Sequence, residues 1–158
     1  MNHSAGDTAP RPERTRMVIA PDIILDLVDL GRGPESRDAA YLFDAIAADV
    51  EAGNKQRPAY VSADVIPWIH TRVNRNAGDA SAREVTLDLL RLVTAVPLTN
   101  QEFYEAARFH GFPYEVAVQF MTCRVIGAKY LVTRHDFGVR RTPVHRRTPA
   151  EILPLFRK

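Results

Sequence analysis

A strand and a helix that meet without a connecting loop open the regular part of this chain. Residues 17–20 form a short apolar segment that stops at Pro21, and a helical apolar stripe over residues 23–30 follows directly. Such a strand–helix unit is typical of an open α/β sheet, in which ligands and catalytic groups collect at the carboxyl ends of the strands. The residue at that position here is Ala20, whose methyl group cannot ligate a cation.

The same alternation continues along the rest of the sequence. Further strands are predicted at 59–62, 93–98 and 129–133, and a fifth at 142–146. Helices are predicted from Pro34 to the Gly53-Asn54 pair, over 64–75, 80–93, 100–110 and 114–126, and from 148 onward. Strands that alternate with helices give a parallel sheet covered on both faces. We therefore expect a three-layer α/β/α sandwich around a central parallel sheet of four to five strands.

Several helix ends carry capping signals. Ser62 is placed to cap the helix over 64–75. Thr99 followed by Glu102 forms a capping box, and Thr148 caps the last helix within the segment 148–151.

The composition indicates one globular domain. The chain has 158 residues, of which 46% are apolar and 25% charged, and these values suit a core of ordinary size. Residues 1–15 are polar and rich in Pro and Gly, so we expect a disordered tail there and a single domain over 16–158. The lone Cys123 cannot form an intramolecular disulfide, and no apolar run reaches membrane-spanning length. The sequence thus predicts a cytoplasmic protein that does not enter a membrane.

A series of short motifs occurs in a distinctive order. They are the opening strand followed by Ile23-Ile-Leu-Asp26, then Tyr60-Val-Ser62, Val96-Pro-Leu98, Gly127-Ala-Lys-Tyr-Leu-Val-Thr-Arg134, Asp136-Phe137 and Thr148-Pro-Ala-Glu-Ile-Leu153. This order resembles the PIN domain, the fold of many bacterial toxin ribonucleases of the VapC type, over nearly all of residues 16–156. In related toxins an antitoxin segment lies across the cleft and the toxins commonly dimerise. The resemblance therefore implies a PIN-like fold, an antitoxin-like partner and a homo-oligomer.

The chemistry of that family depends on three or four carboxylates at the carboxyl edge of the sheet, which hold Mg²⁺ or Mn²⁺. Carried over to this sequence, the first three positions fall on Ala20, Trp68 and Val116, and the fourth falls on His135 or Asp136. Hard divalent cations require oxygen ligands. The resemblance therefore implies a degenerate acidic site, with no metal, no cofactor and no catalytic residue, in a module that binds RNA or protein.

An alternative interpretation restores an acidic cluster through a shift of a few residues. Asp22, Asp64, Glu115 and Asp136 would then supply the ligands of an active Mg²⁺- or Mn²⁺-dependent endoribonuclease toxin. Two considerations oppose it. One residue along a helix turns a side chain by about 100°, which would take Glu115 off the face that Val116 occupies. Asp22 lies early in a helix, where the helix dipole alone favours a carboxylate.

The C-terminal stretch is rich in cationic side chains and is the candidate nucleic-acid-binding surface. Its members are Arg134, His135, Arg140, Arg141, Arg146 and Arg147. Clustered arginines can neutralise phosphates and give salt-sensitive binding of RNA. A solvated basic face, or a contact with an acidic protein partner, explains the same composition equally well.

The remaining candidate groups favour structural interpretations. Trp68 either plugs the cleft or offers a face for base stacking, and its apolar neighbours favour the plug. The aromatic residues 103–114 (Phe103, Tyr104, Phe109, Phe112 and Tyr114) favour a core role, and Cys123 is expected to be a buried small hydrophobe. The five histidines lack the spacing of zinc ligands. A nucleotide- or small-molecule-binding doubly wound domain of unrelated origin is a third interpretation.

Overall fold

A computed structural model of the chain describes residues 15–29, 33–53, 57–138 and 140–156. The tail predicted over residues 1–15 lies outside these ranges except for Thr15. The strands are β1 (Met17–Ile19), β2 (Ala59–Ser62), β3 (Thr94–Val96), β4 (Tyr130–Val132) and β5 (His145–Arg147). The helices are α1 (Pro21–Val28), α2 (Pro34–Glu51), α3 (Val65–Ala77), α4 (Asp79–Leu92), α5 (Asn100–Arg108), α6 (Tyr114–Ile126) and α7 (Pro149–Ile152), followed by the 3-10 helix η1 (Leu153–Phe156).

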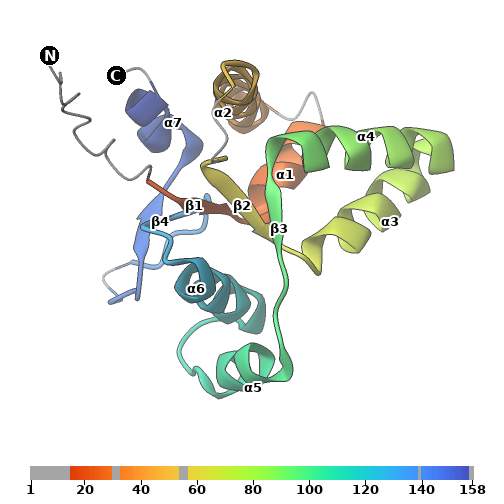
Figure 1. The fold of residues 1–158 in the computed structure, drawn as a ribbon. Coiled ribbons are helices and arrows are strands. Elements are labelled where there is room, and N and C mark those ends of the chain that lie inside the picture. The colour runs from red at the N-terminus through yellow and green to blue at the C-terminus, as the bar shows by residue number, and fades with distance from the viewer. Residues whose placement is uncertain (1–14, 30–32, 54–56, 139, 157–158) are drawn as a thin grey trace, which may run out of the picture.

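The strands form one parallel sheet in the order β3-β2-β1-β4-β5. The central strand β1 pairs Met17 with Ala59 of β2 on one side and with Tyr130 of β4 on the other. Helices cover both faces of this sheet (Figure 1). The predicted α/β/α sandwich with a parallel sheet is therefore confirmed, with five strands in the described part of the chain.

The core consists of two apolar clusters, one on each face of the sheet. Buried side chains of α1, α2, α3, α4 and α7 form the first cluster, and those of α5 and α6 form the second. Successive side chains of a strand point to opposite faces. Met17 and Ile19 accordingly join the first cluster, whereas Val18 and Ala20 join the second. Because side chains alternate between the two faces, Ala20 lies on the face that α6 covers.

The helix ends agree with the predicted signals except at α3. Thr99 donates its backbone N–H to Glu102 Oε2 at 2.6 Å, and Thr148 Oγ1 accepts the N–H of Glu151 at 3.3 Å, so the predicted capping box at Thr99 and the predicted cap at Thr148 are confirmed. The prediction that Ser62 caps α3 is wrong. Asp64 is the N-cap residue, and the Ser62 hydroxyl donates to its carboxylate.

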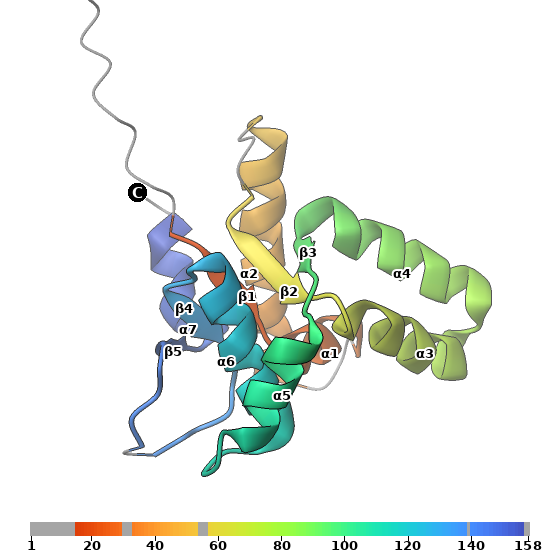
Figure 2. The same ribbon diagram turned by 60° about the horizontal axis from the view of Figure 1, so that its bottom comes forward.

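Helices α3 and α4 form a hairpin that projects away from the sheet beyond β3 (Figure 2). Leu87 and Leu90 of α4 are exposed on it. No helix among the described residues is long and apolar enough to span a bilayer.

The aromatic residues 103–114 are only partly in the core. Phe109 and Phe112 pack around the buried ring of Phe120, with ring centroids 5.8 and 5.1 Å from it. Tyr104 and Tyr114 are exposed, so the predicted core role is wrong for these two residues.

Candidate functional site

A pocket of about 510 Å³ opens at the carboxyl edge of the sheet. Its lining comes mostly from the segment after β1, the N-terminal parts of α1, α3 and α6, and the segment after β4, with Phe103 of α5 and Leu131 of β4. The parallel strands bring these segments together because all of them end at the same edge. This is the place where the sequence predicted that functional groups would meet.

The three positions onto which the first family carboxylates fall do converge on this pocket. Ala20 and Val116 are 4% and 8% exposed, and both line it together with Trp68. Trp68 is 44% exposed and lies on the wall, so the prediction that it plugs the cleft is wrong: an open hollow remains beside it. The three side chains give the pocket an apolar surface.

Asp22 lines the pocket, but its carboxylate oxygens accept hydrogen bonds from another segment of the chain. Thr133 Oγ1 donates to the Asp22 carboxylate, at 3.0 and 3.1 Å from its two oxygens, and the backbone N–H of Arg134 donates to it at 2.8 Å. These bonds join the first turn of α1 to the segment after β4. Asp22 therefore has a structural role in addition to the favourable position at a helix N-terminus.

Two further carboxylates, Asp64 and Glu115, also line the pocket and are exposed. Each lies at the N-terminal end of a helix, where a negative charge is favourable. Glu115 is exposed whereas Val116 is 8% exposed, as expected for side chains on different sides of α6, and both line the pocket. The pocket wraps around the end of α6, where successive residues can reach one hollow.

The fourth family position is divided between two neighbouring hollows. His135 lines the pocket, whereas the carboxylate of Asp136 lies in an adjoining hollow and accepts the N–H of Gly138 at 2.8 Å. Within the described residues, no group of three or more His, Cys, Asp or Glu side chains is placed to hold a metal ion. Asp22, Asp64 and Glu115 share the carboxyl-edge pocket but do not form such a group.

A polar side chain without a predicted role also lies at this pocket. Gln119 is 4% exposed, and its Oε1 atom has no hydrogen-bond partner. It belongs to a run of buried residues, 116–123, on α6. Thr122 in the same run donates its hydroxyl to the carbonyl of Val118 at 2.9 Å. An amide within an apolar run is the signal that could have identified Gln119.

Most of the predicted nucleic-acid-binding residues contact other parts of the chain. Arg134 forms a bidentate ion pair with Asp26, with Nη2 at 2.8 Å from Oδ1, and this carboxylate raises the pKa of the guanidinium. Arg146 Nη2 donates to the carbonyl of Arg134 at 3.0 Å. Arg147 lies over the ring of Tyr130 at 5.4 Å. These three arginines therefore lie together beside β4 and β5.

The other members of that set line two hollows or are exposed. Arg140 donates to the carbonyl of Gly111 and lies 5.6 Å from the ring centroid of Phe112, at the adjoining hollow. Arg141 is exposed, and His135 is at the carboxyl-edge pocket. His135 and Arg140 line the same adjoining hollow, and His135 follows Arg134 directly in the chain.

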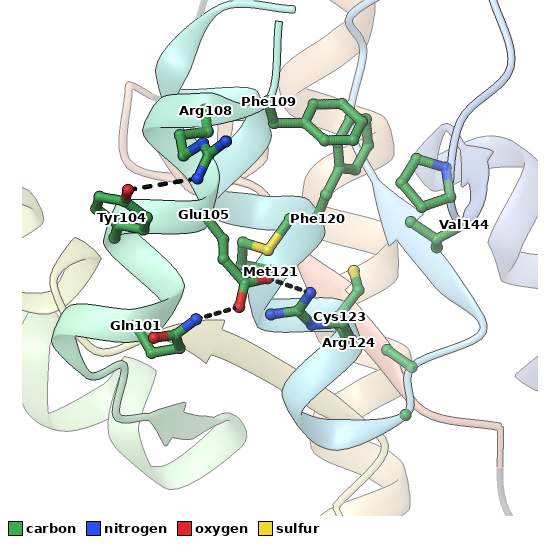
Figure 3. A pocket seen from close by; sticks show the side chains of 13 residues that line it. Gln101, Tyr104, Glu105, Arg108, Phe109, Phe120, Met121, Cys123, Arg124 and Val144 are labelled. Atoms are coloured by element: carbon green, nitrogen blue, oxygen red, sulfur yellow. Dashed lines mark hydrogen bonds and ion pairs between the residues drawn. The ribbon is translucent and has the colours of Figure 1, made fainter.

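A larger groove of about 830 Å³ lies between α5, the C-terminal half of α6 and residues 143–144 (Figure 3). Its polar side chains pair with one another: Arg124 Nη1 is 2.5 Å from Glu105 Oε2, and Arg108 Nη1 is 3.4 Å from the Tyr104 hydroxyl. Cys123 also lines it, and burial raises the pKa of the thiol to about 12. As predicted, Cys123 is a buried small hydrophobe, and its thiol remains protonated at neutral pH.

No protein-family model and no curated protein sequence matches this chain. Among solved structures, the fold is similar to the crystal structure of VapC20, a toxin of Mycobacterium tuberculosis that cleaves the sarcin-ricin loop. The TM-score is 0.55 at 18% sequence identity, and the match covers 73% of this chain and 86% of VapC20. At this identity the likeness concerns the fold. Together with the parallel sheet and its helical layers, it shows that the chain has a PIN-like α/β/α fold.

Proposed function

We propose that this chain is a non-catalytic PIN-like module that holds a protein partner at the carboxyl-edge pocket. The observation that supports this proposal is the apolar surface formed by Ala20, Val116 and Trp68, at the positions onto which family carboxylates map. A pocket of about 510 Å³ lies within the range of sites that enclose a ligand or an anchoring side chain. Such a surface favours binding of apolar groups over activation of water.

The charges around the pocket favour a protein over RNA. Asp64 and Glu115 are exposed at the pocket, and their carboxylates would repel phosphates. Arg134, which directly precedes His135 of the pocket, is already paired with Asp26. An antitoxin-like protein segment, which the resemblance to PIN-domain toxins implies, suits an apolar pocket with an acidic rim.

The test compares two exposed apolar side chains of the protein. Trp68→Ala removes a wall of the pocket, whereas Leu87→Ala removes an exposed apolar side chain of α4 that does not line it. Partners are captured by crosslinking in the native cells and identified by mass spectrometry, and their affinity for the purified chain is then measured. We expect Trp68→Ala to weaken binding at least tenfold and Leu87→Ala to leave it unchanged. Equal effects of the two substitutions would contradict the proposal.

The alternative of an active endoribonuclease has one observation in its favour. Asp22, Asp64 and Glu115 all line the same pocket. That alternative predicts RNA cleavage that needs Mg²⁺ or Mn²⁺, stops with EDTA and is lost in Asp64→Asn and Glu115→Gln. We expect no such cleavage. Cleavage with these properties would contradict the proposed function and support the endoribonuclease alternative.

A third outcome is retention of RNA without cleavage. It would depend on Arg141 and its neighbours, would weaken steeply with salt, and would be reduced by Arg141→Glu. The resemblance also implies a homo-oligomer in the cytoplasm, and light scattering of the purified protein tests the oligomeric mass.

A further inference from the structure

We infer that the last two strands carry a second binding surface, which holds the phosphate backbone of a single-stranded nucleic acid without reading its bases. This surface, the cationic cluster, consists of Lys129, His145 and Arg147 around the ring of Tyr130. The inference goes beyond the proposed function, because no member of the cationic cluster lines the carboxyl-edge pocket.

The register of β4 and β5 gathers the cationic cluster. Tyr130 is the direct neighbour of His145 across the two strands, and Arg147 follows two residues later on the same side of β5. Lys129 directly precedes Tyr130 in the chain. As a result, Lys129 Nζ and the guanidinium carbon of Arg147 each lie 5.4 Å from the centroid of the Tyr130 ring. The ring of His145 lies 6.1 Å from the same centroid.

The cationic cluster is not neutralised within the part of the chain that the structure describes. There, no carboxylate forms an ion pair with Lys129, His145 or Arg147. By contrast, Arg91 of α4 and Arg124 of α6 each pair with a carboxylate. Like charges held close together repel one another, so a polyanion brought to this surface is favourable.

The exposure of the side chains favours contact with phosphates alone. Lys129 and His145 are exposed and Arg147 is partly buried, whereas Tyr130 beneath them is only 9% exposed. Proteins that stack bases need an accessible aromatic face, which Tyr130 does not offer. Lysine, arginine and the N–H of an imidazole each donate to phosphate oxygens. The ligand is therefore recognised by its backbone.

A nucleic-acid strand suits the cationic cluster better than an acidic protein segment does. Each nucleotide carries a phosphate, so a strand presents closely and regularly spaced negative charges. A protein segment would need several acidic residues at matched positions to do the same. A single strand is also flexible enough to bring neighbouring phosphates around one ring, whereas a duplex holds its phosphates at fixed positions.

The first test measures binding to the full chain by fluorescence anisotropy at several NaCl concentrations. The probes are a labelled oligouridylate and a labelled oligothymidylate of equal length. Because only phosphates are contacted, we expect equal affinities, and a plot of log K against log salt concentration with a slope of about −1.4 to −2.1 for two or three phosphates. No binding at about 20 mM NaCl would overturn the inference. A preference of about tenfold for either strand would overturn it as well, since the 2′-hydroxyl or the base would then be read.

Substitutions separate the cationic cluster from the net charge of the protein. Lys129→Gln removes one charge of the cluster, and Arg91→Gln removes one charge of α4 as the matched control; both side chains are exposed. We expect Lys129→Gln to reduce the magnitude of the slope by about 0.7 and to weaken binding about tenfold at about 20 mM NaCl, and Arg91→Gln to change neither. Equal effects of the two substitutions would overturn the inference.

A labelled polyglutamate peptide represents the competing ligand, an acidic protein segment. We expect it to bind more weakly than the oligouridylate at the same salt concentration. Equally tight binding of the peptide, with equal sensitivity to Lys129→Gln, would assign the surface to acidic protein segments and overturn the inference.

The cationic cluster and the carboxyl-edge pocket can be tested separately because they lie on opposite faces of the sheet. Tyr130 belongs to the first apolar cluster, whereas Leu131, which lines the pocket, belongs to the second. Trp68→Ala should therefore leave oligonucleotide binding unchanged, and Lys129→Gln should leave binding of the protein partner unchanged. Loss of oligonucleotide binding in Trp68→Ala would place the nucleic acid at the pocket and overturn the inference.

Discussion

Substitution of Ala20 by aspartate tests whether the end of β1 lies in apolar surroundings. Ala20 is 4% exposed and belongs to the cluster that contains Val116 and Leu131. A carboxylate there faces partial desolvation, which raises its pKa by about 1–3 units. At about 1.4 kcal/mol per unit, Ala20→Asp loses about 1.4–4 kcal/mol of unfolding free energy at neutral pH beyond the cost of the added atoms. Ala20→Asn has nearly the same size without the charge and is the matched control.

The sign of the pH dependence follows from the direction of that shift. The folded Ala20→Asp variant has the higher pKa, so it binds more protons than the unfolded chain between the two pKa values. Its stability relative to Ala20→Asn therefore falls as the pH rises through this interval, from about pH 4 to about pH 7, and then levels off. Urea unfolding of both variants at several pH values measures the difference. Equal stability at about pH 7.5 would show that the position is hydrated and would refute the reasoning.

Four further predictions concern the site and its supports. The triple variant Ala20→Asp, Trp68→Asp and Val116→Asp should gain affinity for Mn²⁺ in calorimetry, because the three positions line one pocket; absence of any heat would show that they are not close enough to share an ion. Thr133→Val removes the hydroxyl donor to Asp22 and should lower the unfolding free energy by about 1 kcal/mol in urea titrations. Cys123 should resist iodoacetamide at pH 8 until denaturant is added, since burial raises the pKa of its thiol to about 12. The Thr99 hydroxyl and N–H hold the pKa of Glu102 below its usual range. This cap should therefore stabilise the protein at pH values above the pKa of Glu102 in the unfolded chain, and its effect should be lost as the pH falls through the pKa of Glu102 in the folded chain. The melting temperatures of the wild-type and Glu102→Gln proteins should accordingly converge in acid.

The fold was predictable because its signals are local. The stop of β1 before Pro21, the capping box at Thr99 and the left-handed Gly127 that ends α6 each depend on residues adjacent in sequence. Their order was sufficient to indicate a parallel sheet between helical layers. The errors, at Ser62 and at the exposed Tyr104 and Tyr114, came from assigning local patterns without knowing which side of a helix faces solvent.

The site was predictable only in its position. From composition alone, Arg134 was expected to be free to bind phosphate. It pairs instead with Asp26, which lies 108 residues away in sequence, and no local pattern reveals that pairing. Gln119 was missed because α6 is buried on nearly every side, so its residues show no helical period that identifies a functional face. Whether a buried amide has a partner depends on atoms from several segments of the chain.

The strand order also determines when this protein can fold during its synthesis. The central strand β1 pairs with β4 between Met17 and Tyr130, so one edge of β1 stays open until most of the chain has left the ribosome. An unpaired strand edge is a template for association with other chains, and long-range parallel pairing forms slowly. Nascent or truncated chains that end before β4 therefore expose the backbone of the innermost strand, and we expect them to depend on chaperones until Tyr130–Val132 arrives.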